Sequence, residues 1–292
     1  MPRLHANDIE IEYDTFGDPA APALVLIMGL ATQMIAWQEP FCQLLADRGF
    51  HVIRFDNRDI GLSTLIEGGP RPDLLAALGG DTSSASYTLD DMADDTAALM
   101  DGLRIDAAHV VGASMGGMVA QALAIRHPQR VLSLTSIMST TGDQAVGQPT
   151  PEALALILQP APTDRDAAVE RSVELFRVVG SEGELFDEEG VRDIAARSWD
   201  RSHSREGVAR QLLAIVASGD RTEGLRHVTA PALVIHGDAD GLVTPDGGAA
   251  TAAAIPGARL LTFPRMGHDL PRQLWPEFVD AIVEVAGRAA PV

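Results

Sequence analysis

One serine stands where a nucleophile is expected. In "HVVGASMGGMVAQALA" (109–124) an apolar run stops at Gly112, Ser114 stands alone, and a helical pattern follows. This is a G-x-S-x-G motif between a predicted strand and a predicted helix, a context in which the turn exposes the serine hydroxyl. We expect Ser114 to be the nucleophile of acyl transfer. The amide of Met115, at the helix N-terminus, is expected to be one oxyanion donor.

A serine nucleophile needs a base that takes its proton. His268, in "FPRMGHDLPRQ", follows the last predicted strand and precedes the final helix. His236 lies inside a predicted strand and is interpreted as a core or loop histidine. His109 lies at the amino end of the strand that leads to Ser114. Because the carboxyl ends of parallel strands share one edge of the sheet, His268 is the predicted base.

The base needs an acid that orients it. The segment "HGDADGLVTP" (236–245) follows the preceding predicted strand and offers Asp238 and Asp240. In such loops the turn residue comes first and the acid follows two residues later, which favours Asp240 and leaves Asp238 as the alternative. Asp269 is expected to point elsewhere when His268 points inward.

A second oxyanion donor is expected in the turn after the early strand "ALVLIMG" (23–29), and its predicted donor is the backbone amide of Leu30. Methionine side chains fit irregular shapes, so several are candidates for the pocket wall. The side chains predicted to line the pocket are Met28, Met34, Trp37, Met138 and Trp199. For Trp37 a place in the core remains an equal alternative.

Strand-like and helix-like segments alternate along most of the chain. Short apolar runs predict central strands at 23–29, 50–56, 108–113, 131–138, 232–238 and 258–264, and an edge hairpin is predicted around 8–17. Helical patterns cover 37–47, 89–103, 115–127, 246–255 and 274–286. This order predicts an α/β fold: a mostly parallel, eight-stranded sheet with helices on both faces.

One long block lacks any strand signal. Residues 140–226 contain helical patterns at 151–158, 165–179, 187–199 and 204–217. An insertion between two parallel strands usually covers the carboxyl edge of the sheet. We therefore predict a helical lid at 140–226 and a core domain made of 1–139 and 227–292. The Gly- and Ser-containing connection at 64–86 is interpreted as a second rim of the pocket.

Composition excludes several classes of function. The net charge is −19, which argues against nucleic acids and anionic membranes as partners. All 22 basic residues are arginine, which rules out lysine chemistry. No G-x-G-x-x-G, H-E-x-x-H or paired cysteines occur, so no cofactor and no metal are expected. The histidine–carboxylate pairs at 236–240 and 268–269 are assigned to the acid and base instead.

The single cysteine, Cys42, excludes an internal disulfide, fits a reducing compartment and is expected to be a buried apolar residue. The N-terminus shows no signal peptide. We therefore expect a cytoplasmic protein whose partner is a small-molecule ester. The oligomeric state is left open between a monomer and a homodimer.

The order Ser, Asp, His along the chain resembles that of the α/β-hydrolase fold. "FDNRDIGLST" (55–64) resembles the D-x-R-G-x-G-x-S turn of that superfamily, with Asp59 where glycine is usual. "MGLATQMIAW" (28–37) resembles its H-G-x oxyanion turn, with Met28 in place of histidine. With "FGDPAAPALVLIMG" and "GASMGG", the chain is similar to the aclacinomycin methylesterase group. That resemblance implies cofactor-free hydrolysis of a methyl ester on a polyketide.

The resemblance also narrows the chemistry, because dehalogenases and most epoxide hydrolases of this fold carry an aspartate at the position of Ser114. We therefore expect a serine hydrolase acting on small to medium apolar esters, with a methyl ester or a lactone as candidates. The alternatives are perhydrolysis or C–C bond hydrolysis by the same three residues, or a non-catalytic binding protein on this scaffold.

Overall fold

A computed structural model describes residues 2–157, 159 and 161–289. Its sheet has eight strands in the order β1-β2-β4-β3-β5-β6-β7-β8, and the pairs from β4 to β8 are parallel. The strands are β1 (Arg3–Ala6), β2 (Ile9–Phe16), β3 (Ala23–Ile27), β4 (His51–Phe55), β5 (Ala108–Ala113), β6 (Val131–Ile137), β7 (Ala232–Gly237) and β8 (Arg259–Phe263). The predicted fold class is confirmed.

The two antiparallel strands form the hairpin at one edge. β1 pairs with β2, and β2 pairs with β4, both in antiparallel sense. Asn7 and Asp8 form the turn with φ of 49° and 62°, the left-handed values that a tight two-residue hairpin turn requires. The sequence pattern therefore located β2 correctly but missed β1 and this turn.

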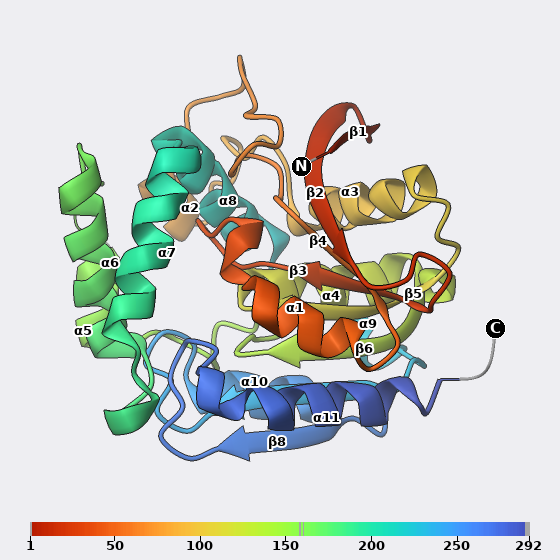
Figure 1. Ribbon diagram of the computed structural model, residues 1–292. Helices are drawn as coiled ribbons and strands as arrows, with labels where there is room; N and C mark the ends of the chain where they lie inside the picture. Colours follow the sequence, from red (N-terminus) through yellow and green to blue (C-terminus); the bar gives the residue numbers. More distant parts are fainter. Residues whose placement is uncertain (1, 158, 160, 290–292) are drawn as a thin grey trace.

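Helices cover both faces of the sheet (Figure 1). α1 (Glu39–Ala46) and α11 (Trp275–Ala286) contact each other and pack on one face. α3 (Leu89–Gly102), α4 (Met115–Arg126) and α10 (Pro245–Ala254) belong to the opposite face. Every residue of β3 and β5 is buried, which explains why these strands read as continuous apolar runs.

The chain between β6 and β7 is helical throughout its regular structure. It contains α5 (Pro151–Ile157), α6 (Arg165–Val179), α7 (Glu188–Arg201), α8 (Arg205–Ser218) and α9 (Thr222–Leu225). In Figure 1, α5, α6 and α7 stand beyond the arrowheads of β6 and β8, at the carboxyl edge of the sheet. The helix predicted at 151–158 matches α5, and Leu158 lies outside the described residues.

Some short helices were not predicted. α2 (Leu74–Leu78) lies in the 64–86 connection and contacts α8. Short 3-10 turns are η1 (Met34–Ala36), η2 (Pro128–Arg130), η3 (Gly183–Leu185) and η4 (Arg272–Leu274). Within residues 2–157, 159 and 161–289, no helix has the length and apolar content that crossing a bilayer requires.

Candidate active site

Ser114 occupies a strained turn between β5 and α4. Its backbone has φ 56° and ψ −122°, a combination that L-residues rarely adopt. The Ser114 N–H donates to the carbonyl of Ile137 at the end of β6 (2.9 Å). Gly117 and Met118 donate back to the Ser114 carbonyl. The main chain itself therefore fixes this turn, and the side chain is left half-buried at its apex.

The glycines around Ser114 are required by close backbone contacts. A Cβ atom on Gly112 would lie 2.0 Å from the carbonyl oxygen of Gly116. A Cβ on Gly116 would lie 2.1 Å from the carbonyl oxygen of Ile27 in β3. Since real Cβ atoms do not approach oxygens so closely, any side chain here would force strand and helix apart. The G-x-S-x-G spacing thus packs the turn against β3 and α4.

Three predicted residues meet in one hydrogen-bonded line. His268 Nε2 lies 2.9 Å from Ser114 Oγ, and His268 Nδ1 lies 2.8 Å from Asp240 Oδ2. Ser114 follows β5, Asp240 follows β7 and His268 follows β8, so the sheet brings them to one edge. The backbone N–H of His268 donates to the carbonyl of Val179, the last residue of α6. This hydrogen bond joins the loop after β8, which carries His268, to the helical segment between β6 and β7.

The carboxylate of Asp240 is fully buried but well satisfied. Its Oδ1 accepts hydrogen bonds from the amides of Leu242 and Val243, both at 2.9 Å. Burial alone would raise the pKa of Asp240. The charge of His268, together with hydrogen bonds from His236 and His268, outweighs burial and lowers that pKa to about 2. Asp240 is therefore ionised at neutral pH, and it lies beside the imidazole of His268.

The alternative acids are occupied elsewhere. Asp238 is exposed, and its Oδ1 accepts from the Arg265 amide (2.6 Å), as expected for a turn residue. Asp269 Oδ1 accepts from the amide and the hydroxyl of Ser181 (2.8 and 2.6 Å). Burial raises the pKa of Asp269. The geometry favours Asp240 as the partner of His268.

The other two candidate histidines, His236 and His109, form hydrogen bonds within the core of the protein. His236 is buried in β7, with Nε2 at 2.8 Å from the carbonyl of Val243 and 3.4 Å from Asp240 Oδ2. His109 Nδ1 lies 2.9 Å from Ser133 Oγ at the amino half of the sheet. Burial lowers the pKa of His109. Neither histidine contacts Ser114 in the described hydrogen bonds.

The turn after β3 lies directly beside Ser114. Thr32 N donates to the Gly29 carbonyl (3.3 Å), which closes a turn through Leu30 and Ala31. A Cβ on Gly29 would lie 3.0 Å from the Cβ of Ser114 and 3.5 Å from its Oγ. The turn that carries the Leu30 amide and the turn that carries the Met115 amide are therefore in contact, as two oxyanion donors require.

Two residues that sequence reasoning missed hold the Leu30 turn. Asn57 Nδ2 donates to the Met28 carbonyl (2.8 Å), and Gln211 Oε1 accepts from the Ala31 amide (3.0 Å). Both contacts join segments far apart in the sequence, and neither residue type carries a local signal for such a role. They support the backbone on either side of Leu30, in a chain that has Met28 where the related motif has histidine.

The predicted pocket residues have different surroundings. Met28 and Met138 are buried in the core cluster on the α1 and α11 face, and Met34 is also buried. Trp37 is fully buried and stacks on Phe41, with ring centroids 5.5 Å apart. For Trp37 the structure therefore favours the core alternative over the pocket wall. Trp199, on α7, is half-buried and stacks on His203.

Cys42 is not a competing nucleophile. Its thiol is buried in α1, and burial raises its pKa to about 12, which keeps it protonated and unreactive. Within the described ranges, no three side chains of His, Cys, Asp or Glu gather as a metal ion would need.

Comparison with known proteins places this geometry in a family. The model of the alpha/beta hydrolase fold family matches residues 22–271. Rhodomycin D methylesterase DnrP of Streptomyces peucetius is 30% identical over 292 residues, covering 92% of both chains. The putative non-heme bromoperoxidase BpoC of Mycobacterium tuberculosis (strain ATCC 25618 / H37Rv) is 33% identical over 269 residues, covering 89% of this chain and 91% of that protein.

Among solved structures, the enol-lactonase from Burkholderia xenovorans LB400 superimposes with a TM-score of 0.76 and is 25% identical. The match covers 98% of this chain and all of that one. The methylesterase and the enol-lactonase among these relatives support the expectation of a carboxylic ester hydrolase.

Proposed function

Because the chain belongs to the α/β-hydrolase fold family, we propose that it hydrolyses carboxylic esters by acyl transfer on Ser114. The observation that carries this proposal is the hydrogen-bonded line from Ser114 through His268 to the ionised Asp240. That arrangement is the one a serine nucleophile needs, because a neutral hydroxyl is weak without a base and the base needs an orienting partner.

The reaction proceeds in two halves. His268 Nε2 takes the proton of Ser114 Oγ as that oxygen attacks the ester carbonyl, and the same nitrogen then protonates the departing alcohol. Asp240 keeps the Nδ1 proton of His268 in place and stabilises the imidazolium that forms. A water molecule activated by His268 next attacks the acyl-serine, releases the carboxylic acid and restores the hydroxyl.

The negative oxygen of each tetrahedral intermediate needs donors that are already in place. The amides of Leu30 and Met115 are the proposed donors, and each is worth about 3 kcal/mol by comparison with oxyanion donors in other enzymes. The close approach of Gly29 to Ser114 supports this assignment, because it places the turn that carries Leu30 beside the turn that carries Met115.

The segment 140–226 is proposed to act as a lid over this site. The hydrogen bond from the His268 backbone amide to the Val179 carbonyl supports a lid here, since it links the end of α6 to the loop that carries His268. A lid of this kind excludes water and offers apolar contacts, so small to medium apolar esters are the proposed substrates. The names of two relatives, a methylesterase and an enol-lactonase, favour a methyl ester or a lactone.

The experiment is hydrolysis of a p-nitrophenyl ester series, from acetate to dodecanoate, by the wild type and by Ser114→Ala. The proposal predicts turnover by the wild type, with an optimum chain length that measures the acyl pocket. It also predicts a loss of about 10³-fold or more in the variant. Unimpaired hydrolysis by Ser114→Ala would refute the role of Ser114.

Perhydrolysis is the second candidate, favoured by the similarity to a protein named as a putative non-heme bromoperoxidase. Supplying hydrogen peroxide with a short carboxylic acid tests it, and Ser114-dependent formation of peracid would support it. C–C bond hydrolysis by the same residues and a non-catalytic binding role are the remaining alternatives. Saturable ligand binding without turnover of any ester would favour the binding role.

A further inference from the structure

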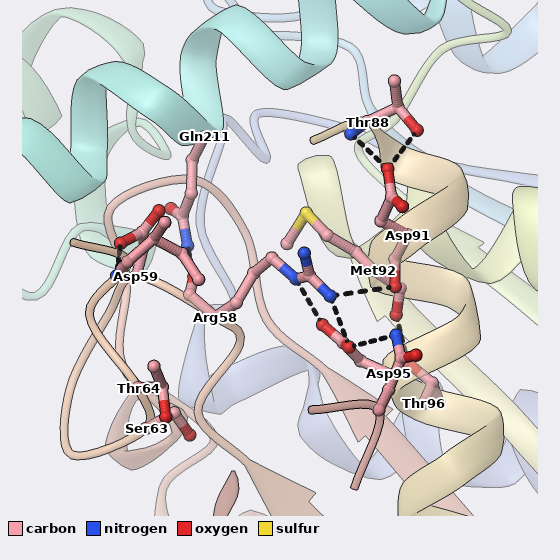
Figure 2. A network of polar contacts seen from close by, with 12 residues as sticks. Arg58, Asp59, Ser63, Thr64, Thr88, Asp91, Met92, Asp95, Thr96 and Gln211 are labelled. Atoms are coloured by element: carbon pink, nitrogen blue, oxygen red, sulfur yellow. Dashed lines mark hydrogen bonds and ion pairs between the residues drawn. The ribbon is translucent and has the colours of Figure 1, made fainter. Parts of the chain in front are cut away.

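Gln211 is a fully buried amide that α8 directs at the core of the molecule. Its Oε1 accepts from the amide of Ala31 (3.0 Å), and its Nε2 donates to the carbonyl of Arg58 (2.8 Å). Figure 2 shows the side chain extending from the helix to the turn that holds Arg58 and Asp59. Gln211 thus joins the helical segment to two turns of the core at once.

The contact with Ala31 fixes the peptide unit next to Leu30. The N–H of that unit belongs to Ala31 and is held by Gln211, while its C=O belongs to Leu30 and accepts from Thr32 Oγ1 (2.9 Å). Ala31 has φ 59°, in the left-handed region that disfavours alanine. A turn with this intrinsic cost keeps its shape only when its surroundings hold it.

The helix that carries Gln211 is itself held firmly against the core. The Asp59 carboxylate receives two hydrogen bonds from Arg210, from Nε (2.8 Å) and Nη2 (2.9 Å), and both side chains are buried. A Cβ on Gly207 would lie 2.1 Å from the carbonyl oxygen of Asp59, so α8 touches this turn directly. Asp59 has φ 68°, where the related motif has glycine.

We propose that Gln211 is a positioning residue for the oxyanion hole, acting on the Leu30 amide through Ala31. This inference rests on the proposed function, because it concerns the donor proposed above. The same proposal explains the role of Asp59, because its carboxylate binds Arg210 and so fixes the part of α8 that carries Gln211. In this way α8 supports the Leu30 turn, in a chain that has Met28 where the related motif has histidine.

The first test is Gln211→Met, which keeps the length of the side chain and removes both hydrogen bonds. We expect kcat for a p-nitrophenyl ester to fall about 10- to 100-fold while KM changes by less than about threefold. The reason is that the oxyanion develops only in the transition state, so its donors affect kcat rather than ground-state binding.

The matched control is Gln121→Met. Gln121 is equally buried, donates to Ser136 Oγ and accepts from Arg221 Nε (both 3.2 Å), and has no hydrogen bond to the Leu30 turn. We expect it to lower Tm about as much as Gln211→Met while keeping kcat within about twofold of the wild type. A shared loss of kcat in both variants would mean that general destabilisation explains the effect, and would overturn the proposal.

A second measurement separates positioning from packing. A trifluoromethyl ketone forms an oxyanion adduct with a catalytic serine, whereas a matching amide that does not react only occupies the pocket. In Gln211→Met the inhibition constant of the ketone should rise in proportion to the loss of kcat/KM, and that of the amide should stay constant. Equal changes for both inhibitors would contradict a role in the oxyanion hole.

Gln211→Glu provides the conservative variant. Its carboxylate oxygen still accepts from the Ala31 amide but, once ionised, no longer donates to the Arg58 carbonyl. We expect its kcat to lie between those of the wild type and Gln211→Met, and it decides the question if the methionine variant does not fold. A wild-type kcat in a folded Gln211→Met protein would overturn the inference, whereas hydrolysis that survives Ser114→Ala would overturn the proposed function instead.

Discussion

The two turns that meet at Ser114 are held in opposite ways. The Ser114 turn is fixed by main-chain hydrogen bonds, within the turn and to Ile137 of β6, and by glycines that allow β3, β5 and α4 to touch. The turn around Leu30 is held by side chains from elsewhere, Asn57 at Met28 and Gln211 at Ala31. One half of the site is therefore held by backbone contacts among the strands and α4, and the other half depends on side chains that distant segments bring to it.

This difference predicts which changes damage the site and how. A change at the Ser114 turn forces backbone atoms apart and affects both folding and activity. A change at the supports of the Leu30 turn leaves the fold in place and lowers the rate. The loop after β7 that carries Asp240 is held both by backbone and by a distant side chain. One carboxylate oxygen of Asp240 accepts from two backbone amides, and the other lies beside the imidazole of His268.

The largest effect is expected from Asp240→Asn. The amide no longer stabilises the imidazolium and favours the wrong tautomer of His268, so kcat should fall about 10³- to 10⁴-fold. Circular dichroism should remain that of the wild type. Asp238→Asn is the matched control, since Asp238 is exposed and its carboxylate accepts from the Arg265 amide. A larger loss in Asp238→Asn than in Asp240→Asn would reverse the assignment of the acid.

Gly116→Ala tests the turn held by the main chain. The new Cβ would lie 2.1 Å from the Ile27 carbonyl oxygen, so α4 must move away from β3. We expect a loss of about 1–3 kcal/mol in the free energy of unfolding and about 100-fold in kcat. Gly287→Ala is the control, because among the described residues the nearest atom to its Cβ would be the Val283 carbonyl oxygen at 3.5 Å. Equal stability of the two variants in urea would show that the close contact is not required.

The pH dependence of stability tests whether the surroundings of Asp240 hold its carboxylate in the ionised form. The pKa of Asp240 is lowered to about 2 in the folded protein, from an ordinary value of 3.8. A lowered pKa stabilises the fold above the ordinary pKa, and this contribution is lost as the pH falls through 3.8 toward 2. It amounts to about 2 kcal/mol.

Urea unfolding of the wild type and Asp240→Asn at pH 6 and at pH 2.5 measures this contribution. The stability difference between the two proteins should shrink by up to about 2 kcal/mol at the lower pH. A difference that is the same at both pH values would mean that the carboxylate is not held in its ionised form by its neighbours.

The smallest effect is expected from Asn57→Leu, which removes the donor to the Met28 carbonyl. Because Gln211 still holds the far side of the turn, we expect a loss of about tenfold in kcat with little change in KM. Combining it with Gln211→Met tests whether the two supports act on one turn. Their effects on the logarithm of kcat should then deviate from additivity, whereas strict additivity would indicate independent sites.

The same contrast explains what the sequence could predict. The fold and the location of Ser114 followed from local patterns, namely continuous apolar runs for the buried strands and glycines at fixed spacing around the serine. The contacts of Asn57 and Gln211 could not be predicted, because each joins residues that are distant in the chain and only the folded structure brings together. Asp59 was noticed as a departure from a motif, and its ion pair with Arg210 on α8 gives the physical reason for it.

The difference between local patterns and long-range contacts also explains why the place of Trp37 could not be predicted. Its position after the Leu30 turn was compatible with both the pocket wall and the core, since spacing alone does not fix where a large aromatic side chain points. Its ring stacks on Phe41, four residues later, and Phe41 in turn meets Trp275 of α11; this second contact is long-range and sequence periodicity does not report it.

The central claim, that Ser114 carries the acyl group, is tested most directly by labelling with a fluorophosphonate and mass spectrometry of the tryptic digest. Trypsin cleaves after Arg104 and Arg126, and the peptide 105–126 contains Ser114 as its single hydroxyl residue. We predict one phosphonate on this peptide, lost in Ser114→Ala and strongly slowed in His268→Ala. Labelling elsewhere in the chain with peptide 105–126 unmodified, while ester hydrolysis is inhibited, would contradict the account.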